Sequence, residues 1–282
     1  MSHRLAFFGP AGTFTEEAAL KYDAREGLDS SLTSMSTITG VYTSVQSKMA
    51  DEGVVPIENS LEGSVPETLD VLVHSDEALF IRDQITIPID HCLLVKPGTE
   101  TNDVEAIYAH PQALGQCREF IERCFPKARV DAALSNAAAV EEMMSKERSA
   151  AIGPKRAAEL YGAEVLAQGI QDRSPNLTRF VILAHEDHAP TGDDKTSLAL
   201  AFATEDRPGL LVASLQEFSK RGINLSKIES RPSKERMGTY IFLMDVAGHA
   251  SEPELAEAIA AIKENCSFFR VLGSYPRHRE SA

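Results

Sequence analysis

The chain has 282 residues, enough for two domains of ordinary size, and its 43% hydrophobic and 25% charged residues are typical of a globular protein. The formal net charge of −14 argues against nucleic acid as a partner, because a phosphate backbone demands a basic surface. Any anionic ligand must therefore be held by local hydrogen-bond donors against an unfavourable overall field.

The N-terminus and the cysteines predict neither export nor a metal site. An apolar run over residues 5–8 stops at Gly9-Pro10, which makes it too short for the core of a signal peptide. No later stretch approaches the roughly 18 apolar residues that a membrane span needs. The four cysteines form no CxxC pair, so neither zinc nor a redox couple is indicated. We therefore expect a cytoplasmic protein with no cofactor, no metal ion and no membrane contact.

Residues 1–183 alternate short apolar strands with amphipathic helices, which is typical of a layered α/β domain with largely parallel strands. The expected strands cover residues 4–8, 53–57, 105–108, 129–132, 150–152 and 178–183. In such sheets ligands bind beyond the carboxyl ends of the strands. Four segments with small or polar residues lie at those ends or, in the last case, at the loop that enters the final strand.

The first segment, Gly9-Pro10-Ala11-Gly12-Thr13-Phe14, carries a strand through a small-residue turn into a helix that we expect to begin near Thr13. The free backbone N–H groups of such a helix end favour an anion. The alternative is a tight strand-to-helix connection with no ligand. A dinucleotide site is disfavoured, because GxGxxG is absent and no acidic residue ends the next expected strand, residues 33–35.

The second segment, residues 56–65, places Glu58, Asn59 and Ser60 between a strand and a helix. A capping-box pattern over residues 64–67 serves that helix, so Asn59 and Ser60 are not needed as its cap. We therefore expect these two side chains to donate hydrogen bonds to a ligand. The alternative is that they stabilise an Asx-type turn.

In the third segment, residues 110–117, Pro111 is expected to open a helix. Gln112 and Gln116 lie four residues apart on one face of it, near its N-terminal end, where an amide reaches a ligand. The alternatives are that an exposed glutamine has no role and that His110 is a turn residue rather than a base. The expected buried stripe of this helix consists of Leu114, Cys117, Ile121 and Cys124.

The fourth segment, residues 174–180, places Thr178 and Arg179 next to each other in a strand. Successive side chains of a strand point to opposite faces, so only one of the two addresses a given pocket. If Thr178 faces the ligand, the alternative role for Arg179 is that of a structural ion. No Ser-His-Asp arrangement, metal-ligand cluster or nucleotide-binding loop in the sequence competes with these four segments.

Polar residues dominate from 184 to 194, and we interpret this stretch as a linker between two domains. The order beyond it is βαββαβ, a ferredoxin-like module. Its expected strands cover residues 197–204, 224–230, 240–246 and 268–272, and its first helix covers residues 210–220. Gly222 sits where the first helix needs a C-cap, and Ser251 forms a capping box with Glu254 at the start of the second helix.

In this order, the four segments and the C-terminal module resemble prephenate dehydratase over nearly the whole chain. The segments Arg207-Pro208-Gly209-Leu210-Leu211-Val212 and Glu229-Ser230-Arg231-Pro232 are similar to ligand-binding signatures of the ACT domain in amino-acid-regulated enzymes. The resemblance implies an α/β fold, with a two-lobe periplasmic-binding-protein-like catalytic domain over residues 1–184 and a ferredoxin-like βαββαβ ACT domain over residues 195–275. The chorismate mutase domain fused to some relatives is not expected, since no helical stretch precedes residue 8.

The family resemblance implies a carbon-oxygen lyase. Prephenate loses water and carbon dioxide to give phenylpyruvate in L-phenylalanine biosynthesis, with feedback control by phenylalanine. The implied catalytic residues are Thr178, Asn59, Gln116 and Glu58. The implied substrate contacts are Ser60, Thr13, Asn136, Arg179 and Phe180. The implied allosteric phenylalanine site consists of Gly209, Leu210, Leu211, Val212, Glu229, Ser230, Arg231 and Pro232.

Two positions depart from the family pattern. Several relatives have a hydroxyl residue where this chain has Ala109, and a Ser-Thr turn where it has Ser135-Asn136. In the implied reaction, aromatisation drives the loss of both groups, and Thr178 donates a hydrogen bond to the departing hydroxyl. Threonine is a poor acid, so the hydroxyl leaves either with this hydrogen bond alone or with a proton relayed from Glu58, His110 or water.

Two alternatives remain open for the function: dehydration of arogenate, and a non-catalytic solute-binding or amino-acid-sensing role on the same scaffold. A βαββαβ unit leaves sheet edges that a second copy pairs with or covers, so we expect a homodimer or a homotetramer built from dimers. The expected partners are therefore prephenate, L-phenylalanine as allosteric effector, and further copies of the chain.

Overall fold

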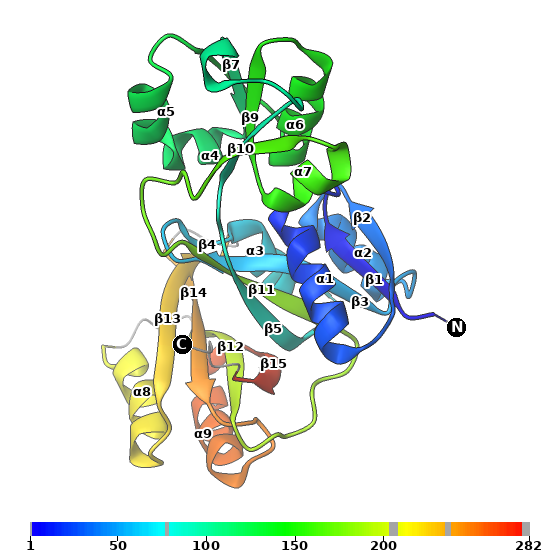
Figure 1. Ribbon diagram of the computed structural model, residues 1–282. Coiled ribbons are helices and arrows are strands. Elements are labelled where there is room, and N and C mark those ends of the chain that lie inside the picture. Colours follow the sequence, from blue (N-terminus) through cyan, green and yellow to red (C-terminus); the bar gives the residue numbers. More distant parts are fainter. Residues whose placement is uncertain (1, 77–78, 203–207, 235–237, 278–282) are drawn as a thin grey trace. The chain divides into compact units, whose positions relative to one another are not determined.

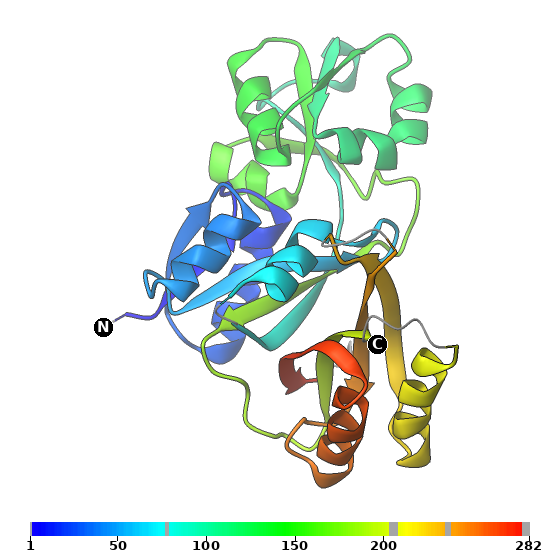
Figure 2. The same cartoon turned by 180° about the vertical axis from the view of Figure 1, so that it is seen from behind.

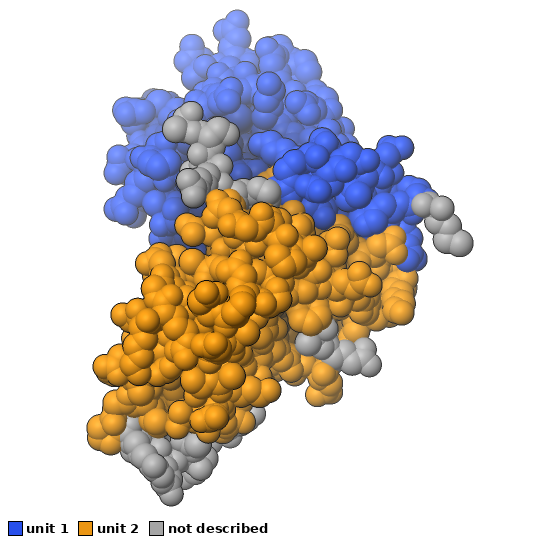
Figure 3. Space-filling view, turned by 90° about the horizontal axis from the view of Figure 1, so that it is seen from below, with its two compact units in different colours: residues 1–41, 54–65, 86–180 blue, residues 42–53, 66–85, 181–282 orange. Residues whose placement is uncertain are grey.

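The computed structural model describes residues 2–76, 79–202, 208–234 and 238–277. By its internal contacts the chain divides into two compact units, which Figure 3 shows in separate colours. Unit 1 comprises residues 1–41, 54–65 and 86–180, and unit 2 comprises residues 42–53, 66–85 and 181–282. Within the described residues, no helix is long and apolar enough to cross a membrane.

The first sheet belongs to the N-terminal α/β lobe (Figure 1). Its strands are β1 (Arg4–Phe8), β2 (Ser31–Met35), β3 (Glu52–Asn59), β4 (Gly63–Ser64), β5 (Phe80–Pro88) and β11 (Leu177–Ala184), and the helices along this stretch of chain are α1 (Phe14–Glu26), α2 (Ile38–Gln46) and α3 (Pro66–His74). The strand order is β2-β1-β3-β11-β5, with β4 paired to β3. β1 and β2 are parallel. The order makes β3 and β11 neighbours although about 120 residues separate them, which matters for the site.

The second sheet forms the other α/β lobe. Its strands are β6 (Cys92–Val95), β7 (Ala106–Ala109), β8 (Arg129–Ala132), β9 (Ser149–Gly153) and β10 (Glu164–Gln168), and its helices are η1 (Thr101–Asp103), α4 (Pro111–Gln116), α5 (Arg118–Cys124), α6 (Asn136–Ser145) and α7 (Lys155–Tyr161). The strand order is β10-β6-β9-β7-β8. Every residue of β9 is buried: Ala150 and Ile152 pack in one core cluster, and Ala151 packs in another. Because both faces of β9 are covered, its central residues Ala150 to Ile152 are apolar in succession instead of alternating with polar ones.

The C-terminal module is a four-stranded antiparallel sheet with two helices. Its elements are β12 (Asp194–Phe202), α8 (Leu210–Lys220), β13 (Leu225–Pro232), β14 (Tyr240–Ala247), α9 (Pro253–Lys263) and β15 (Cys266–Pro276). The strand order β13-β14-β12-β15 is that of a ferredoxin-like βαββαβ fold. α8 and α9 lie on one face of the sheet (Figure 2). On that face Phe218 and Leu255 join Leu198 and Met244 in a single core cluster.

Helix α3 is fastened to this C-terminal sheet at both of its ends, all within unit 2. At the first turn, the Arg231 guanidinium donates to Pro66 O (3.2 Å) and to Asp70 Oδ1 (3.3 Å). At the last turn, Arg270 donates to two backbone carbonyls of the helix end, at 3.0 and 2.9 Å. Since helix carbonyls at a C-terminus lack intrahelical partners, the second contact satisfies groups that otherwise need water.

The α/β fold, the two-lobe organisation and the ferredoxin-like module confirm the main expectations from the sequence. Six of the strands expected before residue 184 are found as β1, β3, β7, β8, β9 and β11, and the further strand expected at residues 33–35 is found as β2. The structure adds β4, β5, β6 and β10, which were not expected. β6 and β10 run antiparallel to their neighbours, so the expectation of largely parallel strands fails for the second sheet. β5 escapes a pattern-based prediction because it buries the polar pair Asp83 and Gln84.

Two local predictions are wrong. α9 begins at Pro253 without a side-chain cap, because Ser251 Oγ forms a hydrogen bond with His249 Nδ1 (2.8 Å) instead of capping the helix. Cys124 is exposed, because the expected single helix is divided into α4 and α5 and its buried face is shifted. Phe125 takes the buried position next to it.

Candidate active site

Five polar side chains of unit 1 form one connected set of hydrogen bonds, which we call the amide network. Asn59 Nδ2 donates to Asn176 Oδ1 and to Thr178 Oγ1, at 2.8 Å in each case. Asn176 Nδ2 donates to Gln116 Oε1 (3.0 Å), and the same oxygen lies 2.9 Å from His91 Nε2. Three of these residues, Asn59, Gln116 and Thr178, are among the four expected to be catalytic, and the fourth, Glu58, is not part of the network.

The two lobes each contribute to the amide network. Asn59 ends β3, Asn176 directly precedes the neighbouring β11, and Thr178 is the second residue of β11. Gln116 ends α4, and His91 directly precedes β6, both in the second lobe. The side chains are largely buried, with relative exposures of 9% for Asn59 and 8% for Thr178. Polar groups at this depth need hydrogen-bond partners, and here they supply partners for one another, except at His91 Nδ1.

Two backbone groups fix the direction of the hydrogen bonds in the amide network. Asn59 Oδ1 accepts from the N–H groups of Leu61 (2.9 Å) and Glu62 (3.0 Å), so the amide nitrogen must face Asn176. Asn176 therefore turns its oxygen to Asn59 and its nitrogen to Gln116. Gln116 accordingly turns its oxygen to Asn176. The amide orientations thus follow from backbone donors that cannot be reversed.

This fixed direction makes Thr178 a hydrogen-bond donor. Its Oγ1 accepts from Asn59, and the hydroxyl carries one hydrogen of its own. Among the described residues, no acceptor pairs with that hydrogen. Gln116 Nε2 also points outward, with one hydrogen toward Glu62 Oε1 (3.3 Å) and a second one available. The site therefore presents donors, as a ligand with carboxylates or a hydroxyl requires.

Asn59 combines both roles that the sequence left open. It closes an Asx-type turn over Leu61 and Glu62, and its amide nitrogen orients Thr178. Both hydrogens of that nitrogen are used within the protein, so Asn59 is not free to donate to a ligand as expected. Ser60, the other expected donor, accepts from the backbone N–H of β11 (3.0 Å), and its hydroxyl hydrogen has no acceptor among the described residues.

Glu58 and Arg179 form an ion pair. The Arg179 guanidinium donates to Glu58 Oε2 at 2.8 and 3.2 Å. Because side chains alternate along β3 and β11, this pair points to the opposite side from Asn59 and Thr178. The structural-ion alternative for Arg179 therefore matches its position. Phe180, an expected substrate contact, is only 2% exposed and belongs to the core.

The glycine turn before α1 binds a carboxylate of the protein itself, that of Glu16. Gly12 N donates to Glu16 Oε2 (2.7 Å), and Arg156 Nε pairs with the same oxygen (3.2 Å). Thr13 is the N-cap: its Oγ1 accepts from Glu16 N (3.4 Å) and donates to Pro10 O (2.9 Å). The arrangement is the tight strand-to-helix connection given as the alternative to a ligand site.

Two other expected residues lie at helix starts in the second lobe. Asn136 is the first residue of α6, whose N-cap Ser135 accepts from Ala138 N (3.0 Å). Asn136 Oδ1 is buried, and no described residue pairs with it. His110 is the N-cap of α4, and its Nδ1 accepts from Gln112 N (3.3 Å). Burial lowers the pKa of His110, which favours the neutral ring that this acceptor role needs.

Two members of the amide network, Asn176 and His91, carry no sequence signal of their own. Asn176 lies inside the fourth segment beside a proline, where a turn residue is ordinary. His91 is 2% exposed, and its ring packs edge-on against Phe14, with 5.5 Å between ring centroids. Its position directly before a buried strand is the only hint available, since ligands in α/β folds gather at strand ends.

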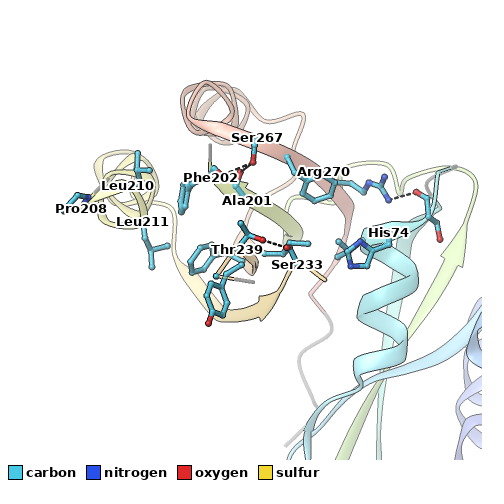
Figure 4. A pocket seen from close by; sticks show the side chains of 18 of the residues that line it. His74, Ala201, Phe202, Pro208, Leu210, Leu211, Ser233, Thr239, Ser267 and Arg270 are labelled. Atoms are coloured by element: carbon cyan, nitrogen blue, oxygen red, sulfur yellow. Dashed lines mark hydrogen bonds between the residues drawn. The ribbon is translucent and has the colours of Figure 1, made fainter. Parts of the chain in front are cut away.

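A second candidate site lies in unit 2, at the start of α8. Gly209 is the N-cap with a φ of 96°, a left-handed conformation that favours glycine, and no side chain of the described residues caps the helix. The N–H groups of that first turn suit an anion. Next to them is a cavity of about 770 Å³ (Figure 4). Its lining includes Phe202, Leu210, Leu211, Thr239, Ser267 and Arg270. Val212 is 58% exposed, and Arg207 lies outside the described residues.

The remaining expected effector residues lie in β13. Side chains alternate there, so Glu229 and Arg231 are half-buried while Ser230 and Pro232 are exposed. The Arg231 guanidinium is engaged with α3, as described above. The segment therefore links the C-terminal sheet to the helix that follows the Asn59 turn in sequence.

Comparisons with known proteins agree with this architecture. Residues 5–188 match the family model of prephenate dehydratase, and residues 200–264 match that of the ACT domain. A bifunctional chorismate mutase/prephenate dehydratase from Aquifex aeolicus is 43% identical over 274 residues, which is 97% of this chain and 74% of that protein. The crystal structure of prephenate dehydratase from Arthrobacter aurescens in complex with L-Phe is 35% identical, with a TM-score of 0.87 over 97% of this chain and 90% of that one. GqqA, described as a novel type of quorum quenching acylase, is 28% identical, with a TM-score of 0.85 over 98% of each chain.

Proposed function

This chain belongs to the prephenate dehydratase family, and we propose that it converts prephenate to phenylpyruvate with loss of water and carbon dioxide. The observation that carries the proposal is the amide network, which leaves the Thr178 hydroxyl as an oriented donor. A dehydration needs such a donor at the oxygen that departs. Three residues expected from the family resemblance meet in this one network, although they come from distant parts of the sequence.

In the proposed reaction, Thr178 donates a hydrogen bond to the ring hydroxyl of prephenate as its C–O bond breaks. The bond between the ring and its carboxylate also breaks, so that the carboxylate leaves as carbon dioxide. The electron pair of this C–C bond completes the aromatic ring. Gln116 Nε2 and the Ser60 hydroxyl hold the pyruvyl carboxylate throughout. Because the ring carboxylate loses its charge on leaving, donors that stabilised it strongly would slow the reaction.

We assign Glu58 a supporting role and take water as the source of the proton for the departing hydroxyl. Glu58 accepts two hydrogen bonds from Arg179 on the opposite side of the strand pair, which supports a role in holding β3 against β11. His110 uses its unprotonated Nδ1 as a helix cap and therefore has no proton to give from that atom. Thr13 and Phe180 likewise act by shaping the site, and Asn136 Oδ1, still unpartnered, is the further contact that we propose for a substrate or a bound water.

The proposed domain organisation is a catalytic domain over residues 1–184 and a regulatory ACT domain over residues 195–275. L-phenylalanine is the proposed effector. Its carboxylate meets the first-turn N–H groups of α8 beside Gly209, and its ring enters the cavity lined by Leu210 and Leu211. Binding at this place inhibits if the effector favours a less active arrangement by its differential affinity.

We further propose that the protein works in the cytoplasm as a homodimer or a homotetramer, since the exposed edges of an antiparallel sheet invite pairing with a second copy. Light scattering coupled to size-exclusion chromatography measures the mass. A single species of about 31 kDa, the monomer mass, over the micromolar range would contradict the proposal.

The function is tested by incubating the purified protein with prephenate and, separately, with arogenate, and by identifying the aromatic product. We expect phenylpyruvate from prephenate. Phenylalanine formed from arogenate at a higher kcat/KM would assign the alternative substrate, and no product from either would refute a dehydratase. An acylase assay completes the set, because of the likeness to GqqA. We expect no hydrolysis, since no imidazole among the described residues pairs with the hydroxyl of Ser60 or Thr178 to activate it.

A further inference from the structure

His91 stands out among the buried polar residues because only half of its ring is satisfied. Its Nε2 lies 2.9 Å from Gln116 Oε1, whereas its Nδ1 is buried and no described residue pairs with it. The side chain is 2% exposed, so water does not routinely reach the ring. A buried acceptor without a donor is unfavourable and calls for an explanation.

The tautomer of His91 follows from the amide network. Gln116 presents its oxygen, because Asn176 Nδ2 donates to it and the direction of that bond is fixed from the backbone N–H groups beyond Asn59. An oxygen accepts, so His91 Nε2 must carry the hydrogen and donate. Burial lowers the pKa of His91, which keeps the ring neutral and leaves Nδ1 as an unprotonated acceptor.

Packing alone does not account for a histidine at this position. The ring lies edge-on to Phe14 in a buried position that a phenylalanine side chain would fill without burying an unpaired nitrogen. What the imidazole adds is the Nε2–H donor to Gln116. With it, the Gln116 oxygen is held from two sides, by Asn176 and by His91, and the amide plane is fixed.

We propose that His91 is a positioning residue, which through its Nε2–H fixes the Gln116 amide so that Gln116 Nε2 donates to the pyruvyl carboxylate of the substrate. The inference deepens the proposed function and rests on it. Its consequence is a specific division of effects: His91 acts on substrate binding by way of Gln116, and not on the departing hydroxyl at Thr178.

The kinetic test compares His91→Phe with His91→Gln. Phenylalanine keeps the ring contact and removes the donor, whereas glutamine places an amide N–H close to where the Nε2–H was. We expect His91→Phe to raise KM about five- to tenfold, the usual weight of one neutral hydrogen bond, with kcat changed less than threefold. We expect His91→Gln to restore KM to within about twofold of the original chain. In a Gln116→Ala background, His91→Phe should add no further rise in KM.

Three kinetic results would overturn the proposal: an unchanged KM in His91→Phe, an equal defect in both His91 variants, or a full additional rise of KM in the Gln116→Ala background. Thermal unfolding of each variant accompanies the kinetics. His91→Phe removes an orphaned acceptor and leaves Gln116 Oε1 bonded to Asn176, so we expect its melting temperature to stay within a few degrees.

A second readout does not depend on turnover. Long-range ¹H–¹⁵N correlation spectra of the histidine rings distinguish the two neutral tautomers, and we expect the Nε2–H form for His91 at neutral pH. An Nδ1–H form would overturn the inference directly. If the protein failed to convert prephenate, the proposed function would fail, while these spectra would still decide whether His91 donates to Gln116.

Discussion

Replacement of Asn59 by aspartate, Asn59→Asp, exchanges one NH₂ group for one oxygen at the point where the amide network begins. The retained oxygen still accepts from the N–H groups of Leu61 and Glu62, so the turn survives. The new oxygen faces Asn176 Oδ1 and Thr178 Oγ1, each 2.8 Å from the atom it replaces. Thr178 then donates its only hydroxyl hydrogen to the carboxylate and has none left for the substrate.

The expected loss of kcat follows from the role of the Thr178 hydroxyl hydrogen, which is donated to the departing oxygen of the substrate. Removal of one preorganised donor from a developing negative charge costs about a hundred- to a thousandfold in kcat. We therefore expect kcat of Asn59→Asp to fall at least a hundredfold, as far as in Thr178→Ala. Folding stability should fall by about 1 to 3 kcal/mol: the hydrogen bonds to the turn become charge-assisted, but Asn176 must rotate its amide and thereby loses its hydrogen bond to Gln116 Oε1. Asn59→Ala removes the turn bonds as well and should lose about 2 to 4 kcal/mol.

The assay is the appearance of the aromatic keto acid at saturating prephenate, with urea unfolding of the same preparations. The two measurements together separate a lost donor from a lost fold. A kcat of Asn59→Asp above about a third of the original would refute the argument that hydrogen-bond direction makes Thr178 the donor. So would a drop in kcat that Thr178→Ala fails to reproduce.

Thr178→Ser keeps the hydroxyl and should retain about a tenth or more of kcat, while Thr178→Ala should lose at least a hundredfold with KM nearly unchanged, as steady-state kinetics will show. Glu58→Gln should keep kcat within about threefold, because its carboxylate pairs with an arginine; a hundredfold loss would instead make it the proton source. Burial lowers the folded-state pKa of His91 below its ordinary 6.5, against the smaller raising effects of the hydrogen bond with Gln116 and the charge of Asp90, so the folded protein binds fewer protons than the unfolded one. Stability should therefore fall as pH drops below about 6.5, and urea unfolding of His91→Phe should show a flatter fall. Gly209→Ala strains a φ of 96° at the start of α8 and should weaken phenylalanine inhibition at least tenfold. The control, Gly222→Ala, has a φ of 68° beyond the end of the same helix and should destabilise the protein similarly without changing inhibition. Calorimetric titration with phenylalanine measures whether only Gly209→Ala weakens binding.

Much of the fold can be predicted from the sequence, because the spacing of hydrophobic residues and the turn residues specify helices and strands locally. β1, β9 and the βαββαβ module follow from apolar runs and from glycines at helix ends. The missed strands show the limit of this signal. β5 carries polar residues that are buried by other elements. These elements are distant along the chain, so the local sequence pattern of β5 does not predict that its polar residues are buried. Likewise, the separation of α4 from α5 changes the buried face of a helix that reads as continuous.

The site divides in the same way. Asn59, Gln116 and Thr178 stand in motifs, so resemblance to a family finds them. Their mutual hydrogen bonds depend on β3 lying next to β11, which is a property of sheet order and not of either segment. Asn176 and His91 enter only through those contacts. The direction of the bonds, from backbone donors outward, is likewise visible only when the turn after Asn59 is seen closed.

The turn after Asn59 also bears on how the protein ages. Asparagine deamidates when the backbone nitrogen of the following residue attacks the side-chain carbonyl carbon and ammonia leaves. Water then opens the resulting succinimide to isoaspartate or to aspartate, and aspartate is the residue introduced by Asn59→Asp. In this chain the attacking nitrogen belongs to Ser60 and donates to Leu177 O at 2.8 Å, while the carbonyl is held in place by two N–H groups. Attack therefore requires this contact between β3 and β11 to open first. The hydrogen bonds that set the polarity of the site are thus the same ones that protect it from losing that polarity spontaneously over the lifetime of the molecule.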